Sequence, residues 1–246
     1  YTPATGIPEL KEEVAKYYER RFGLKYNPSK EVIIGSGAKP LIFESLGCFV
    51  DPGDEVLIFA PAWVSYVEQI KLCGGKPVII DTTQSNFLPS PSSIEASLTP
   101  NTRGMIINTP SNPVGVVYPE ETLQAIADLV VKHDLWIIYD EIYERLVYDE
   151  LEHINIVSLD SRLRDRTILI NEASKAYAMT GWRIGYALCP QEAMSKIGDL
   201  QGHLTSNPCS IAQWAALGAL RGAEEDVKKM HKAFDERRKK MVSLLR

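Results

Sequence analysis

Seven short apolar runs recur along the chain, and each is followed closely by a polar residue, a glycine or a proline. The runs are residues 32–34, 56–59, 78–80, 105–107, 135–139, 168–170 and 184–188. Continuous apolar runs, unlike alternating ones, indicate strands that are buried on both faces. Helical patterns separate them, which favours crossover connections. The chain therefore predicts a three-layer α/β/α fold around a mostly parallel seven-stranded sheet.

The helical stretches carry signals of their own. A helix is expected from Pro8 to about Phe22, and another over the apolar residues 41–50. A third helix should run over 119–133, because its leading proline suits the first helical turn. Its apolar stripe, which would face the sheet, consists of Leu123, Ile126, Ala127 and Val130. Residues 84–91 look like a loop. The pattern is helical again from position 210 to the end, with a break near position 222.

Composition and charge narrow the choice of partners. The chain has 246 residues, of which 45% are hydrophobic and 24% charged, with a formal net charge of −5. This balance is that of a globular chain with about one to two domains. Nucleic acids and membrane surfaces attract clustered Lys and Arg. The basic run over 228–240 is interrupted by Asp235 and Glu236, which indicates a solvated helix face. We expect no nucleic-acid partner and no membrane association.

The four cysteines, at positions 48, 73, 189 and 209, show no redox or metal-ligand spacing. The four histidines show none either, so no metal site is expected. All four cysteines lie in or beside apolar stretches. They are therefore predicted to be buried free thiols, which fits a reducing compartment such as the cytoplasm.

Several polar or turn-forming residues follow the predicted strands directly. They are Gly35, Pro61, Asn108, Asp140 and Asn171. In open α/β sheets, ligands bind beyond the carboxyl ends of the strands. A ligand site is expected at this edge of the sheet.

Asp140 and Lys175 are the first candidates for chemistry. A carboxylate at the end of a buried strand needs a partner or a cation, although Asp140 could equally cap a helix that opens at Glu141. Lys175 follows another strand. In a partly apolar pocket a lysine can act as a nucleophile toward carbonyls, but on a loop it can simply extend into solvent. The local pattern leaves both alternatives open.

Three further segments could bind a ligand. The small residues 35–38 precede a helix whose free N–H groups could bind phosphate, although many strand-to-helix turns are glycine-rich. Trp63 could stack on an aromatic ligand or belong to the core. Asn112 lies in a turn and could point its amide into the crevice. The bond from Asn112 to Pro113 is a candidate for the cis form.

These segments together resemble one family. Residues 174–186, Ser-Lys-Ala-Tyr-Ala-Met-Thr-Gly-Trp-Arg-Ile-Gly-Tyr, resemble the lysine signature of class I and II aminotransferases, closest to the bacterial-type aspartate aminotransferases. Further stretches resemble the same family in the same order over nearly the whole chain: 1–10, 37–39, 51–56, 63–66, 112–113 and 140–143. The resemblance implies the large domain of a fold-type I enzyme that uses pyridoxal 5′-phosphate (PLP). It also implies an amino acid and a 2-oxo acid as substrates.

The resemblance assigns catalytic roles. Lys175 would bind the cofactor covalently and later move a proton. Asp140 would pair with the pyridine nitrogen and keep it protonated. Tyr143 and Asn112 would donate hydrogen bonds to the phenolic oxygen of the ring.

It also assigns cofactor-binding roles. Trp63 would stack on the ring, and Arg183 would bind the phosphate with its planar guanidinium. The other expected cofactor contacts are Ser174 and the backbone amides of Gly37, Ala38 and Lys39. Tyr1 resembles a tyrosine that reaches the phosphate of the neighbouring subunit, which implies a homodimer with shared active sites.

The chain departs from the family at several points. Glu172 stands where many relatives have a serine that contacts phosphate. Because a carboxylate is repelled by phosphate, Glu172 is expected to point away, or phosphate binding to be weaker. Pro40 and Val114 stand where glutamine and threonine are common; both changes look tolerable. No counterpart of the small domain, with its carboxylate-binding arginine, is recognisable.

We therefore expect a PLP-binding large domain over 1–210, and over 211–246 terminal helices that lead toward a missing small domain. Aspartate is the expected amino donor. The alternatives are aromatic amino acids, alanine, kynurenine or prephenate as substrate, a ligand-sensing domain of a regulator, or a catalytically incomplete PLP-binding fragment. An incomplete fragment would be at most weakly active, because its substrate would be poorly oriented.

Overall fold

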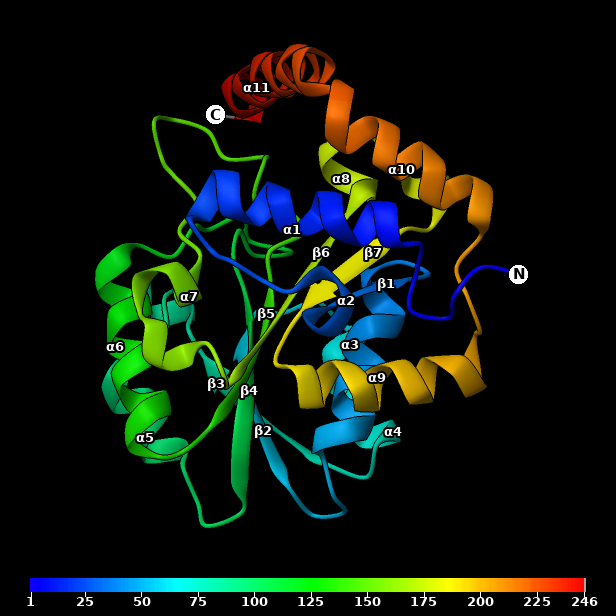
Figure 1. Cartoon of the computed structure of the whole chain (residues 1–246). Helices are drawn as coiled ribbons and strands as arrows, with labels where there is room; N and C mark the ends of the chain where they lie inside the picture. The colour runs from blue at the N-terminus through cyan, green and yellow to red at the C-terminus, as the bar shows by residue number, and fades with distance from the viewer. Residues whose placement is uncertain (246) are drawn as a thin grey trace.

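The computed structural model describes residues 1–245, and its centre is a seven-stranded sheet with helices on both faces (Figure 1). In spatial order the strands are β1 (Val32–Gly35), β7 (Gly185–Leu188), β6 (Thr167–Glu172), β5 (Trp136–Asp140), β4 (Thr102–Asn108), β2 (Glu55–Ala60) and β3 (Lys76–Asp81). Strand β7 is antiparallel to both of its neighbours, and the other neighbouring pairs are parallel. The predicted mostly parallel sheet of seven strands is confirmed.

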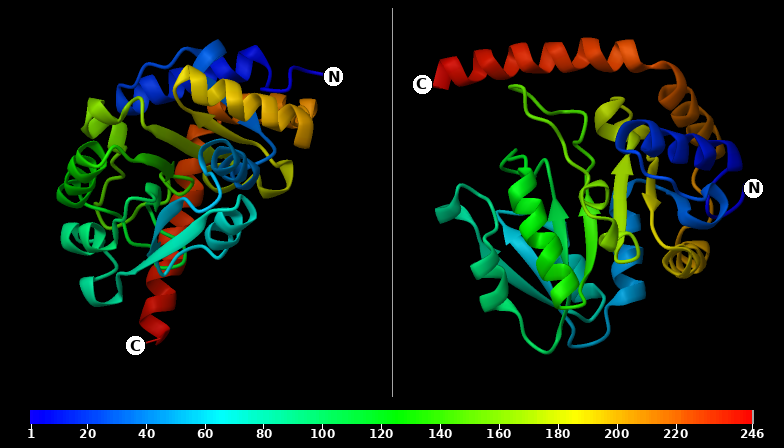
Figure 2. Two further views of the ribbon diagram at one scale, coloured as in Figure 1. Left: turned by 90° about the horizontal axis from the view of Figure 1, so that it is seen from below. Right: turned by 60° about the vertical axis from the view of Figure 1, so that its left-hand side comes forward.

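Helices form a layer on each side of the sheet (Figure 2). One layer holds α1 (Pro8–Phe22), α5 (Pro91–Ser97), α6 (Glu120–Lys132), α7 (Ile156–Leu159) and α10 (Ser210–Gly222). The opposite layer holds α3 (Ala38–Phe49), α4 (Ser65–Leu72) and α9 (Gln191–Leu204). Each layer has its own hydrophobic cluster. Successive residues of β5 alternate between the two clusters: Ile137 and Tyr139 belong to one and Ile138 to the other. This alternation explains the continuous apolar runs.

Local signals define the helix ends. Helix α1 starts at a proline and ends at Gly23, whose φ of 70° suits a left-handed cap. Helix α6 begins at Glu120, one residue later than expected, because Pro119 is its N-cap. The predicted stripe of α6 is buried against the sheet. Residues 83–85 form a 3₁₀ turn, η1 (Thr83–Ser85), which overlaps the start of the segment 84–91 that was expected to be a loop.

The chain ends in a long helix, α11 (Glu224–Leu245), after a break at Ala223. The view on the left of Figure 2 shows the C-terminal end of α11 extending past the body of the molecule. Two ion pairs attach it to the loop that follows β5, Arg145–Glu224 and Arg238–Asp149. The other short elements are α2 (Pro28–Glu31), α8 (Ala173–Ala176), η2 (Ser161–Leu163) and η3 (Thr180–Trp182). Within residues 1–245, no helix is long and apolar enough to cross a membrane.

Two predictions about burial are wrong. Strand β3 is at the edge of the sheet, so its residues are mostly exposed and Ile79 retains 57% of its accessible surface. An apolar run in the sequence does not show whether its strand will pair with one neighbouring strand or with two. Cys209 is exposed because it precedes α10, whose buried face starts only at Ala212. Cys189 is buried, the other two cysteines are partly buried, and all four are free thiols.

Candidate active site

A cavity of about 190 Å³ opens at the carboxyl ends of β4, β5 and β6, beside the N-terminus of α3. It brings together most of the residues singled out in the sequence. Those that line it are Ala38, Lys39, Trp63, Asn112, Asp140, Tyr143, Lys175 and Arg183. Gly37 and Ser174 directly border this group, since each contacts Arg183 or its neighbours. Tyr1 is fully exposed and lies outside the cavity of its own chain.

The register of the sheet explains why these residues meet. Asn108, the last residue of β4, pairs with Asp140, the last residue of β5. On the other side, Gly185 at the start of β7 pairs with both Glu172 and Gly35, the last residues of β6 and β1. Four strand ends therefore lie side by side at one edge of the sheet.

Asp140 lies at the bottom of the cavity and is 1% exposed. The Tyr66 hydroxyl donates to its Oδ2 at 2.5 Å, and the Ile142 N–H donates to its Oδ1 at 3.3 Å. Burial raises the pKa of Asp140 to about 7, and these two hydrogen bonds oppose the rise. The residues after Asp140 form a turn and no helix. The alternative role as a helix N-cap is therefore wrong, and Asp140 caps only this turn.

Lys175 lies on α8 and reaches the cavity from the opposite side. Its Nζ lies 3.8 Å from Oε1 of Glu172 and 5.8 Å from the ring centroid of Tyr143. The Asn112 amide donates to the Tyr143 hydroxyl at 3.3 Å, so both donors point into one region. Oδ1 of Asn108 accepts the backbone N–H of Asn112 at 2.7 Å and holds this turn in place. Burial raises the pKa of Tyr143, which keeps its hydroxyl protonated.

Two glycines shape the N-terminus of α3. Gly37 has a φ of +103°, and a Cβ there would lie 2.3 Å from Nη2 of Arg183. A Cβ at Gly185 would lie 2.5 Å from the backbone nitrogen of Ala38. Both positions therefore need glycine. Arg183 lies beside the free N–H groups of the helix and donates to Ser174 Oγ at 3.4 Å. Together they make a cradle for an anion.

Trp63 forms one wall of the cavity. Its ring meets the Tyr66 ring edge to face, with centroids 5.2 Å apart. The ammonium group of Lys39 lies 4.8 Å from the Trp63 ring centroid. The bond between Asn112 and Pro113 is cis, as expected.

Glu172 differs from the prediction that it points away from the phosphate cradle. Its Oε2 accepts the backbone N–H of Ala38 at 3.1 Å, and its side chain lines the cavity. The N–H groups at the start of a helix lack intrahelical partners and favour a nearby carboxylate. The prediction considered only repulsion by a bound phosphate and left out this attraction.

Two polar lining residues were given no specific contact in the sequence-based prediction of the site, although Asn108 belonged to the strand-end residues where a ligand was expected. Tyr66 is the hydrogen-bond partner of Asp140, and Asn108 donates from its amide to the Asp140 carbonyl at 3.0 Å. The available signal was the stretch 63–66, which resembles the family and contains Tyr66; in the structure Trp63 precedes α4 and Tyr66 lies in its first turn.

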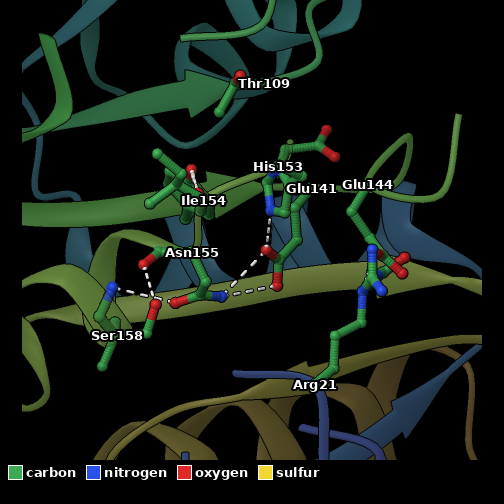
Figure 3. A network of polar contacts seen from close by, with 12 residues as sticks. Arg21, Thr109, Glu141, Glu144, His153, Ile154, Asn155 and Ser158 are labelled. Carbon is green, nitrogen blue, oxygen red and sulfur yellow. Dashed lines mark hydrogen bonds and ion pairs between the residues drawn. The ribbon is translucent and has the colours of Figure 1, made fainter. Parts of the chain in front are cut away.

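A buried polar network surrounds Glu141, the residue that follows Asp140 (Figure 3). The Glu141 carboxylate accepts from the Tyr18 hydroxyl at 2.7 Å and from the Asn155 amide at 3.0 Å. Nε2 of His153 lies 2.6 Å from the same carboxylate. These contacts join α1 and the loop before α7 to the end of β5. The sequence showed no sign of this network, because Tyr18 lies 123 residues from Glu141 and no local pattern relates Glu141 to the loop residues His153 and Asn155.

The fold and the cavity define a class of protein. A lysine, a buried carboxylate and a cluster of anion-binding groups at the strand ends of an α/β sheet are an arrangement that suits a PLP enzyme. The family described as "Aminotransferase class I and II" matches residues 1–246. The chain belongs to this family, whose members depend on PLP.

The most similar relatives include bacterial aspartate aminotransferases. The chain is 45% identical to an aspartate aminotransferase of Geobacillus stearothermophilus over 238 residues, which are 96% of this chain and 60% of the relative. It is 44% identical to an aspartate/prephenate aminotransferase of Cereibacter sphaeroides, over the whole chain and 62% of the relative. The crystal structure of the aspartate aminotransferase from Rhizobium meliloti superposes with a TM-score of 0.94 at 38% identity, covering 97% of this chain and 60% of that one. The chain thus spans about 60% of the length of these relatives.

The close approach of Gly37 to Arg183 leaves backbone N–H groups and a guanidinium facing the same space, which suits a phosphate. The described part of the chain has no group of three or more His, Cys, Asp or Glu side chains that could hold a metal ion.

Proposed function

We propose that this chain is the PLP-binding part of an aminotransferase that moves an amino group between aspartate and a 2-oxo acid. The observation that carries the proposal is that Lys175, Asp140 and Tyr143 share one cavity with the anion cradle. Aspartate as donor rests on the names of the relatives, several of which are aspartate aminotransferases.

Each residue has a physical task in this proposal. Bound PLP supplies a ring that accepts the electrons left on the substrate when its α-proton departs. Lys175 would hold the cofactor covalently; once the substrate amine displaces it, its free Nζ would take that proton and return it. Asp140 holds the positive charge at the ring nitrogen. The Tyr143 hydroxyl and the Asn112 amide would donate hydrogen bonds to the phenolic oxygen of the ring.

The remaining residues bind and orient. Arg183, Ser174 and the backbone N–H groups of Gly37, Ala38 and Lys39 hold the phosphate. Trp63 covers one face of the ring and excludes water from it. Orientation of this kind is a large part of the rate enhancement in such sites.

Reduction with borohydride tests the proposal. The purified protein should be yellow, and borohydride should fix a pyridoxyl group on Lys175, which peptide mass spectrometry would locate. The Lys39→Ala variant serves as a control, because Lys39 is the other lysine that lines the cavity. It should still carry the tag, whereas Lys175→Ala should carry none. A tag on another lysine, or PLP bound without any tag, would refute the assignment.

The amino donor needs a separate experiment. Relatives named as aspartate/prephenate aminotransferases favour prephenate as a second substrate. A screen of amino donors against the full-length protein, followed by the absorbance of the cofactor, distinguishes the two. If the protein uses aspartate only, aspartate alone should convert the cofactor. If prephenate is a second substrate, the amino acid formed from prephenate should convert it as well.

We also propose a homodimer with shared sites, in which Tyr1 reaches the phosphate bound by the partner. Its support is a second, largely apolar cavity of about 540 Å³ beside Lys39, bordered by the exposed side chains of Val64, Leu72 and Leu204. A surface of this kind is typical of a subunit contact. Sedimentation of the full-length protein should give a dimer, and Val64→Asp should shift it toward the monomer. A wild-type protein that sediments as a monomer would contradict the proposal.

The domain organisation and the location are proposals as well. Residues 1–210 would form the cofactor-binding domain, and 211–246 would lead toward a smaller one. The cavity draws all of its lining residues from positions 38–183, which supports this division. Four free cysteines favour the cytoplasm.

A further inference from the structure

Glu172 stands at the centre of the anion cradle. The side chain is 7% exposed. Its Oε2 lies 3.1 Å from the backbone nitrogen of Ala38, and its Oε1 lies 3.8 Å from Nζ of Lys175. One carboxylate thus accepts a hydrogen bond from the first residue of α3 and also lies beside the amine of Lys175.

The position of Glu172 follows from the sheet. Glu172 is the last residue of β6 and pairs with Gly185 of β7. Because Gly185 has no side chain, the start of α3 packs directly onto that strand, which brings the Ala38 N–H within reach of the Glu172 carboxylate. Oε2 also lies 3.6 Å from where a Cβ of Gly37 would stand, a point that is 2.3 Å from Nη2 of Arg183. The carboxylate therefore lies among the groups assigned to the phosphate.

We propose that the Glu172 carboxylate is a resident anion of the cradle, which the phosphate group of a ligand must displace from the Ala38 N–H. The inference rests on the proposed PLP site. A carboxylate and a phosphate are both anions and cannot share this N–H. Glu172 therefore competes with phosphate and lowers the affinity of this chain for any phosphorylated ligand. A ligand without phosphate does not meet this competition.

A purely structural role for Glu172 makes a different prediction. If the side chain only caps the first turn of α3, its removal should lower stability and leave ligand affinity unchanged. If it competes with phosphate, removal of its charge should raise the affinity for phosphate. Affinity for phosphate therefore separates the two roles.

The experiment compares the full-length wild-type protein with Glu172→Gln and Glu172→Ala. Gln keeps the shape of the side chain and loses the charge, and Ala serves if Gln impairs folding. Glu192→Gln is the matched control, because Glu192 is an exposed carboxylate on helix α9, pairs with Lys196 and lies outside both the site cavity and the apolar cavity beside Lys39. The probes are inorganic phosphate, by calorimetry, and PLP and pyridoxal, by absorbance.

We expect Glu172→Gln to bind inorganic phosphate and PLP about tenfold more tightly than wild type, as the loss of a like charge about 4 Å away implies. The affinity for pyridoxal should change less than the affinity for phosphate or PLP, and Glu192→Gln should match wild type with all three probes. Equal phosphate affinities in wild type and both variants would overturn the inference, and so would weaker phosphate binding by the variants.

The two proposals fail in different ways. If no variant binds PLP or pyridoxal while phosphate still binds more tightly to Glu172→Gln, the proposed function is wrong and the competition by Glu172 stands. If PLP attaches to Lys175 in all variants with equal affinity, the proposed function stands and the inference about Glu172 is wrong.

Discussion

The Tyr66 hydroxyl donates a 2.5 Å hydrogen bond to the Asp140 carboxylate, and so joins helix α4 to the end of strand β5. Both residues are at least 98% buried. Tyr66 also packs against Trp63, the wall of the cavity. One side chain therefore orients the carboxylate and supports the surface on which a cofactor ring would lie. The same relationship makes Tyr66 a positioning residue.

Removal of the Tyr66 hydroxyl should destabilise the folded chain, because Asp140 loses a hydrogen-bond donor. Tyr66→Phe deprives Asp140 of a bond that lowers its pKa, so the pKa should rise further above about 7. At pH 8 we expect Tyr66→Phe to lower the free energy of unfolding by about 1–3 kcal/mol. Urea unfolding of Tyr66→Phe, Asp140→Asn and the double variant would measure the coupling between the two residues.

Tyr26→Phe is the matched control for Tyr66. The Tyr26 hydroxyl is buried without a hydrogen-bond partner among the described residues. Tyr26→Phe should therefore change the free energy of unfolding little. A Tyr66→Phe protein as stable as Tyr26→Phe would contradict the coupling.

Asp140 should make stability depend on pH in the absence of cofactor. Its pKa in the fold is about 7, above its ordinary value of 3.8, so the folded chain holds the extra proton between these values. Stability from this residue is therefore present at acidic pH and is lost as pH rises from about 4 to about 7. Asp140→Asn does not titrate. It should match wild type near pH 4 and exceed it at pH 8 by at most about 4 kcal/mol.

Urea unfolding of the cofactor-free protein at pH 5 and pH 8 measures this effect. The difference between Asp140→Asn and wild type should grow with pH. A difference that shrinks toward pH 8 would show that Asp140 has an ionised partner. With saturating PLP, wild type should be more stable than Asp140→Asn at pH 8, because a cationic ring nitrogen favours the carboxylate.

Gly37 should be intolerant of any side chain. Gly37→Ala places a methyl group 2.3 Å from Nη2 of Arg183 and at a φ of +103°. We expect a loss of at least about tenfold in affinity for phosphate, and a stability cost of about 1–3 kcal/mol. Gly23→Ala is the control, since Gly23 also has a positive φ but has no atom within 4 Å of an added Cβ. It should cost about 1 kcal/mol and leave phosphate affinity unchanged. Equal phosphate affinity in wild type and Gly37→Ala would rule out the assigned cradle.

The buried network around Glu141 should dominate the stability of the region behind the site. Glu141→Ala leaves the Tyr18 hydroxyl, the Asn155 amide and His153 without their shared acceptor (Figure 3). We expect a loss of about 3–5 kcal/mol in urea unfolding. Glu225→Ala removes an exposed ion pair with Lys228 and should change stability by less than about 0.5 kcal/mol. Similar losses in both variants would mean that the network contributes little.

Much of the fold could be predicted because burial leaves a local trace in the sequence. The seven strands, the start of α1 and the break before α11 follow from runs, prolines and periodicity that are read within a few residues. The exposure of β3 could not be predicted, because an edge strand differs from a central one only in its neighbours. The exposure of Cys209 could not be predicted either, because the sequence does not show which face of the following helix α10 is buried.

The sequence by itself determined which residues follow the strands, and its motifs marked Lys175, Asp140 and Arg183 as members of one site. The tertiary structure alone decided how they face one another. The hydrogen bond from Tyr66 to Asp140 and the turn of Glu172 toward Ala38 join segments 74 and 134 residues apart in the chain. Such contacts depend on strand order and register, and these arise from the packing of the whole sheet rather than from any local pattern.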